Sequence, residues 1–190
     1  GILLARRSTG QAAGRTHLHQ CRFYGHFSEA CVYSYASEEN YYTECEFFQE
    51  GDSSGNGGRC CLLIASTNVH SITSDHFTLY SGDYSNNGHY ISGCYFSYNP
   101  TTAHADAAVI QTYGVGGFHL TDSYLNLGAS LSEPFIHIRK DLAGSGRVSD
   151  RMTIERNRFH NTGGTTACLI GGSGAWQMHR FSFRQNVAPS

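Results

Sequence analysis

The sequence predicts an all-β fold of the solenoid type, in which short strands stack coil upon coil around a narrow core. The first observation is a recurring frame: an apolar residue, a small or polar residue three positions later, and an apolar residue two positions after that. It occurs at Leu18-Cys21-Phe23, Tyr42-Cys45-Phe47, Ile72-Asp75-Phe77, Ile91-Cys94-Phe96, Leu120-Ser123-Leu125, Ile154-Asn157-Phe159 and, more weakly, Phe183-Asn186-Ala188. The second observation is composition, because the 190 residues include 22 glycines and few windows rich in helix-forming residues.

The spacing within the frame explains this prediction. Offsets of three and two suit two β-segments that meet at a bend better than they suit the apolar stripe of a helix. The small or polar residue at the bend can stack on its equivalent one coil away and hydrogen-bond along the stack. One coil alone cannot bury its apolar face, so neighbouring coils must stack to form a continuous core.

Taken in order, the chain reads as a lead-in over residues 1–16 followed by a series of rungs. Each rung begins with one frame, and the rung from Ile72 to Tyr80 is compressed. The other complete rungs continue into a second apolar run, with the sequences CVYSY, CCLLIA, AAVIQTY, PFIHIRK and ACLIGG. The Gly- and Ser-rich segment 50–59 lies between two strands of its rung and should protrude. We expect six to seven rungs in one domain over residues 1–190, as a segment of a longer chain.

The seven cysteines are predicted to be buried free thiols. Their number is odd, and Cys21, Cys45 and Cys94 share the bend position of the frame. Free cysteine behaves as a small hydrophobic residue, so stacked thiols in a narrow core are expected rather than disulfides.

Charge is distributed unevenly along the chain. Residues 21–60 are mostly acidic where charged and residues 139–184 mostly basic, while the net charge is −2. A nucleic-acid-binding domain would be basic overall, so no nucleic-acid partner is expected. The basic end suits an anionic glycan or the next part of an assembly. The chain has no apolar run of membrane-spanning length, so no membrane partner is expected either.

A column of side chains follows the bend position on successive rungs. It contains Arg22, Glu46, His76, Tyr95, Tyr124 and Arg158. Equivalent residues on stacked strands lie about 4.8 Å apart, so this column could lie along a sugar polymer. We predict that His76, Tyr95, Tyr124 and Arg158 bind substrate, with His137 nearby. The alternative is an ordinary solvated strand face, since tyrosine and arginine also favour cross-strand contacts.

Carboxylates are the candidates for catalysis. If AAVI in one rung is equivalent to PFIH in the next, Asp106 and Glu133 occupy matching positions about 5 Å apart, which suits a retaining glycosidase. Two carboxyl groups at this distance would raise one pKa, as a general acid requires. Glu46 is a weaker candidate, and the alternative for all three is ordinary solvated acids.

A metal site is not expected. His17, His19 and Cys21 alternate along a possible strand and could present three zinc ligands. However, Cys21 already has a core position in the frame, and no fourth ligand can be named. We expect neither a metal nor another cofactor.

The repeated segments YTECEF, ISGCYF, LTDSYL and IERNRF, followed by short apolar strands, resemble the right-handed parallel β-helix of the pectate-lyase-like superfamily. Within that superfamily the chain looks most like the shaft of a bacteriophage tailspike. The resemblance implies a homotrimer on the virion tail that binds, and in many members cleaves, a polysaccharide of the host surface. No catalytic signature of the family matches residue by residue.

Three classes of function therefore stay open from the sequence. The first is a tailspike that recognises a surface polysaccharide, with or without cleaving it. The second is a secreted polysaccharide lyase or hydrolase, and the third is a structural or adhesive β-helix without chemistry.

Overall fold

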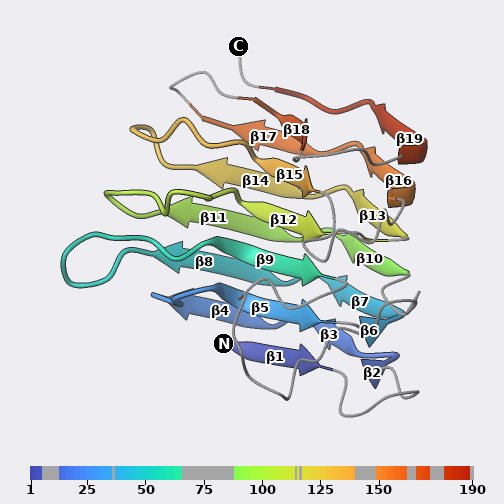
Figure 1. Ribbon diagram of the computed structural model, residues 1–190, viewed down its shortest axis with the longest axis horizontal. Coiled ribbons are helices and arrows are strands. Elements are labelled where there is room, and N and C mark those ends of the chain that lie inside the picture. Colours follow the sequence, from blue (N-terminus) through green and yellow to red (C-terminus); the bar gives the residue numbers. More distant parts are fainter. Residues whose placement is uncertain are drawn as a thin grey trace.

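The protein is all-β, and its strands form three parallel sheets. The computed structural model describes residues 1–5, 13–35, 37–65, 88–113, 115, 117–139, 149–161, 166–171 and 178–188 (Figure 1). Within these ranges all of the regular secondary structure consists of β-strands. Successive strands of the chain belong to different sheets, and the strands stack in layers from the N-terminus to the C-terminus (Figure 1). This arrangement is consistent with the predicted β-solenoid.

The three sheets are built as follows, with their strands in spatial order. The first sheet contains β1 (Ile2–Ala5), β5 (Ala30–Tyr35), β9 (Cys60–Ala65), β12 (Ile110–Tyr113), β15 (Ile136–Arg139) and β18 (Cys168–Gly171). The second sheet contains β19 (Met178–Arg184), β16 (Ser149–Glu155), β13 (Phe118–Thr121), β10 (His89–Ser92), β7 (Asn40–Thr43) and β3 (His17–His19). The third sheet contains β17 (Arg158–His160), β14 (Tyr124–Leu127), β11 (Tyr95–Asn99), β8 (Glu46–Glu50) and β4 (Arg22–Gly25). A short pair, β2 (Ala13–Gly14) with β6 (Ser37–Glu38), lies beside them.

The pairing register matches six of the seven predicted frames. In the second sheet the first residues of these frames pair in succession, as Leu18, Tyr42, Ile91, Leu120, Ile154 and Phe183. In the third sheet Phe23, Phe47, Phe96, Leu125 and Phe159 do the same. Because side chains alternate between the two faces of a strand, this register stacks apolar residues coil upon coil on the inner side. Most of them are completely buried.

The prediction that residues Ile72 to Tyr80 form a layer between the second and fourth frames is wrong. Strand β7 pairs directly with β10, and β8 pairs directly with β11, so no strand lies between them. Residues 72–80, and with them His76, lie outside the described residues. The frame at Ile72 was misleading because three residues at short spacing are too little information to distinguish a rung from a connection.

The bend between the second and third sheets has the same backbone conformation in each layer. The residue before the bend position has a positive φ, from 52° to 63°, at Gln20, Glu44, Gly93, Asp122, Arg156 and Gln185. We call these six residues the corner column. The left-handed conformation is costly for residues other than glycine, so its recurrence indicates that the bend requires it.

Side chains at the bend position hydrogen-bond along the stack, as predicted. The Ser123 amide donates to Asn157 Oδ1 at 3.0 Å, and Asn157 Nδ2 donates to the Leu120 carbonyl at 2.9 Å. The thiol of Cys94 donates to the Tyr42 carbonyl at 3.3 Å. All seven cysteines are free thiols, as predicted, and five of them are buried, whereas Cys21 and Cys168 are only partly buried. The ladder therefore gives the Ser123 amide, which lies at the bend between two strands, a hydrogen-bond partner.

The loop between β8 and β9 projects from the stack, as expected for segment 50–59 (Figure 1). Its tip is held by Asp52, whose carboxylate accepts hydrogen bonds from the amides of Ser54 and Asn56 at 2.8 and 2.9 Å. These bonds lower the pKa of Asp52.

Candidate functional site

The outer face of the third sheet carries an unbroken line of aromatic rings. It runs across all five strands through Tyr24, Phe48, Tyr95, Tyr124 and His160, and we call it the aromatic strip. Neighbouring ring centroids are 5.8, 5.4, 5.3 and 6.1 Å apart along this line. The strip follows from the register, which places outward side chains of adjacent strands beside one another.

The predicted binding column shares Tyr95 and Tyr124 with this strip. Arg22, Glu46, Tyr95, Tyr124 and Arg158 pair in succession in the third sheet. The predicted position of His76 between Glu46 and Tyr95 is excluded, because these two residues are direct partners. Tyr95 and Tyr124 are half-buried, and their rings are stacked with an interplanar angle of 5°. These stacked rings cover one another's faces, so Tyr95 and Tyr124 present ring edges and phenol hydroxyl groups to a ligand.

Charged groups lie beside both halves of the strip. The Arg22 guanidinium is 4.9 Å from the centre of the Phe48 ring and makes an ion pair with Glu46 at 3.0 Å. Arg158 lies on the exposed side of β17 next to Tyr124. No carboxylate among the described residues pairs with the Arg158 side chain.

An open cavity of about 350 Å³ lies between this strip and the corner column. Its walls are formed by Gly93, Cys94, Tyr95, Asp122, Ser123, Tyr124, Arg156, Asn157, Arg158, Gln185 and Val187. Three of the predicted binding residues, Tyr95, Tyr124 and Arg158, therefore line one cavity. Their arrangement offers aromatic edges, two guanidinium groups and hydroxyl groups on a rigid sheet.

The wall opposite the strip is fixed by ion pairs. Arg156 donates to both carboxylate oxygens of Asp122 at 2.7 Å, and this contact lowers the pKa of Asp122. Glu155 behind it binds Arg184 at 2.6 Å and Ser182 at 2.9 Å, and these partners lower its pKa. Both acids are therefore held ionised, so neither is suited to be a general acid near neutral pH.

The predicted pairing of Asp106 with Glu133 rests on a register that is wrong by one residue. Ile110 pairs with Ile136, whereas the predicted equivalence required His137 opposite Ile110. Asp106 instead contacts Arg59 and Arg139, each at 3.4 Å, in a polar network over the first sheet. The Glu133 carboxylate accepts a hydrogen bond from the Ser132 amide at 3.0 Å.

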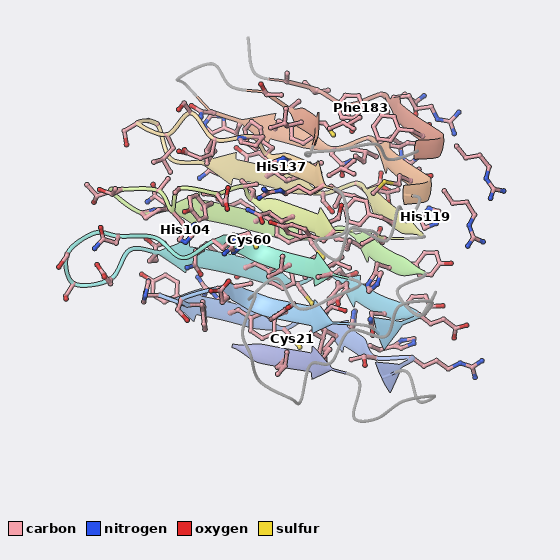
Figure 2. All side chains as sticks on the ribbon, in the orientation of Figure 1. Cys21, Cys60, His104, His119, His137 and Phe183 are labelled. Carbon is pink, nitrogen blue, oxygen red and sulfur yellow. The ribbon has the colours of Figure 1, made fainter. Side chains whose placement is uncertain are left out.

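His137 belongs to this polar network on β15 and not to the aromatic strip (Figure 2). Burial and the neighbouring Arg139 lower the pKa of His137 to about 4, although Asp106 acts in the opposite direction. The imidazole is therefore neutral at physiological pH. The predicted site residues thus fall into two groups, on the third sheet and on the first sheet.

Sequence reasoning missed several residues of the cavity and the strip. Tyr24, Phe48 and His160 were overlooked because the strip moves diagonally between two columns of outward side chains. Asp122 and Arg156 were overlooked although a signal existed, because the residue before each bend position in the six matching frames is polar or glycine. That pattern is typical of a left-handed backbone position.

The described residues contain no group of three or more His, Cys, Asp or Glu side chains able to hold a metal ion. The ring of His17 and the side chain of His19 are exposed, while the Cys21 thiol donates to the His19 carbonyl. Across the same part of the chain there is no helix long and apolar enough to cross a membrane.

Comparison with known protein families, curated proteins and solved structures gave no match to this chain.

Proposed function

We propose that the protein is a right-handed parallel β-helix of the tailspike type that binds a polysaccharide of the host cell surface. The observation that carries the proposal is the aromatic strip, which spans a whole sheet and is continuous with a cavity lined by arginines. The strands beneath it have a buried, stacked core, so the strip is held rigidly. A preorganised surface of this kind loses little conformational entropy when it binds an extended polymer.

Binding is better supported than cleavage. The carboxylates near the strip, Glu46 and Asp122, are each paired with an arginine. Asp106, the first catalytic candidate, is paired with two arginines on another sheet. Hydrolysis of a glycosidic bond usually requires one protonated and one ionised carboxyl group placed on either side of the bond. The described acids do not form such a pair around the cavity.

The resemblance to tailspikes supports two further parts of the proposal, a homotrimer and a location on the virion tail. Light scattering tests the first part directly. A stable trimer is expected, while a monomer would favour the secreted polysaccharide lyase or hydrolase instead. Release of reducing ends from a bound polymer would show cleavage in either case.

The binding proposal is tested with a panel of purified polysaccharides. The panel contains bacterial capsular polysaccharides, O-chains of lipopolysaccharide, linear polygalacturonate and alginate, and branched xanthan. Wild type is expected to retain at least one polymer, and Tyr124→Ala and Arg158→Ala are expected to weaken that binding about tenfold each. Leu169→Ala is the control, because Leu169 is exposed on the first sheet away from the strip. Failure of wild type to bind any polymer, or equal binding by all variants, would contradict the proposal.

A further inference from the structure

A second column of rings lies on the outer face of the second sheet. It contains His17, Tyr41, Tyr90 and His119, with neighbouring centroids 4.4, 5.0 and 4.9 Å apart. The ring planes of Tyr90 and His119 are almost parallel, with an interplanar angle of 3°, and Tyr90 is 38% exposed. His119 lies on β13 at the outer side of the stack (Figure 2). This second column lies on a different sheet from the aromatic strip, and the proposed function does not yet give it a role.

The corner column separates the two aromatic surfaces, and its long polar side chains are bonded to each other. Gln20 donates to Glu44 at 2.8 Å near the N-terminal end, and Arg156 binds Asp122 toward the C-terminal end. Gly93 lies between these two pairs and has no side chain. A Cβ atom at this position would have Glu44 Cγ as its nearest neighbour, at 3.7 Å, so there is free space above the backbone.

The backbone alone does not demand glycine at position 93. Its φ of 63° is close to the values at Gln20, Glu44, Asp122, Arg156 and Gln185, which all carry side chains. The glycine therefore leaves a gap in an otherwise filled column, and we call this gap the Gly93 notch. The cavity beside the aromatic strip extends to Gly93 itself.

The notch connects the two aromatic surfaces at one layer of the stack. Tyr90 lies on β10 before it and Tyr95 begins β11 after it. Two hydroxyl groups lie near the notch on the second sheet, where the Thr121 hydroxyl donates to the Ser92 hydroxyl at 3.3 Å. A ligand group leaving the cavity at Gly93 would therefore meet hydroxyl groups and the edge of the Tyr90 ring.

We propose that the ligand is a branched polysaccharide, whose side branch passes over the Gly93 notch and binds beside Tyr90 and His119. This inference rests on the proposed function, because the main chain of the ligand is taken to lie along the aromatic strip. It assigns a binding role to Tyr90, His119 and Gly93. The notch is as wide as one missing side chain, so it leaves room for a single narrow group to pass between the two surfaces.

The experiment compares Gly93→Gln with Gly93→Ala. Both variants carry the same cost of a Cβ atom at a positive φ, but only glutamine fills the notch, as Gln20 and Gln185 do in their layers. Binding is measured with the panel above, with each branched polymer used intact and after enzymatic removal of its side branches. Thermal unfolding of both variants shows whether each remains folded.

Wild type is expected to bind a branched polymer more tightly than its trimmed form. Gly93→Gln and Tyr90→Ala should weaken binding of the intact polymer about tenfold, and each should weaken binding of the trimmed polymer by a clearly smaller factor. Gly93→Ala should weaken binding of the intact polymer by a smaller factor than Gly93→Gln, because one methyl group leaves most of the notch open. Leu169→Ala, on the first sheet, should bind both forms as wild type does. Equal binding of intact and trimmed polymers by wild type, or wild-type binding by folded Gly93→Gln, would overturn the inference. If Tyr124→Ala still weakens binding in that case, the proposed function stands without the branch site; if no polymer binds wild type, both fail.

Discussion

The two sides of the third sheet carry ring stacks of nearly identical geometry. On the inner side, the centroids of Phe47 and Phe96 are 4.7 Å apart with an interplanar angle of 4°. On the outer side, Tyr95 and Tyr124 are 5.3 Å apart with an angle of 5°. The inner rings are completely buried, whereas the outer rings are only half-buried.

The comparison shows that ring stacking in this fold is a consequence of register and not by itself a sign of function. Any column of aromatic residues in a parallel sheet is brought to the spacing of the strands. What distinguishes the two stacks is access to solvent and the arginines beside the outer one. The inner stack should therefore determine stability, and the outer stack should determine binding.

The sharpest test of this difference is truncation of one ring from each side. Phe96→Ala removes a fully buried side chain between coils and should lower the free energy of unfolding by about 3–5 kcal/mol. Tyr95→Ala, its neighbour on the same strand, should lower it by about 1 kcal/mol. Urea denaturation measures both. Similar losses for the two variants would show that the outer stack is also structural.

His137 is partly buried, and its titration extends the comparison between buried and exposed side chains to the dependence of stability on pH. The pKa of His137 is lowered from 6.5 to about 4 in the folded protein. Between these values the unfolded chain binds a proton that the folded chain does not, so stability falls as pH falls from 6.5 towards 4. The loss attributable to His137 is about 3 kcal/mol at most.

His137→Gln removes this titration and provides the matched variant. Urea denaturation at pH 7, 5.5 and 4 should show a smaller loss of stability with acidification for His137→Gln than for wild type. Parallel pH profiles for the two proteins would mean that His137 titrates normally in the folded state.

The bend ladder allows the same inside-to-outside comparison for hydrogen bonds. Asn157 is completely buried, and Asn157→Ala would leave the Ser123 amide without its partner and remove a bond to the Leu120 carbonyl, at a cost of about 1–3 kcal/mol. Asn186 makes equivalent bonds one layer further, to the Asn157 amide and the Ile154 carbonyl, but is only partly buried. Asn186→Ala should therefore cost less, because water can replace the lost partner. Denaturation of both variants checks this order, and an equal cost would contradict it.

The sequence was sufficient to place the stacked columns because the frame marks where the chain bends. Leu18, Cys21 and Phe23 have equivalents in register up to Ile154, Asn157 and Phe159. In each of these layers two inward side chains flank a small residue at the bend. The pattern is not sufficient alone, since the same frame at Ile72 forms no layer between β7 and β10. The aromatic column at Tyr95 and Tyr124 followed from the same alignment.

Register in the first sheet could not be predicted in the same way. Its strands follow loops of different length, and their apolar runs contain no bend residue to anchor an alignment. The amides of Cys61 and Leu62 both donate to the Val109 carbonyl, at 2.9 and 3.4 Å, so the ladder is irregular where these strands begin. A shift of one residue there separated Asp106 from the predicted position opposite Glu133. Such a shift has no signature in composition or periodicity.

The smallest expected effect concerns Glu46, on the exposed side of the same strand as Phe47. The side chains of Arg22 and Glu46 are 66% and 47% exposed, so their ion pair should contribute less than about 0.5 kcal/mol to stability. A double-mutant cycle with Arg22→Gln and Glu46→Gln, followed by urea denaturation, measures this coupling.

The same variants test the remaining catalytic prediction for Glu46, since Glu46→Gln keeps the shape of the side chain and removes its charge. If the protein releases reducing ends from a bound polysaccharide and Glu46→Gln abolishes that release without weakening binding, Glu46 is catalytic and the strip cleaves its ligand. If release persists or never occurs, Glu46 acts only by holding Arg22 over the Phe48 ring, and the outer face of the third sheet is a surface for binding alone.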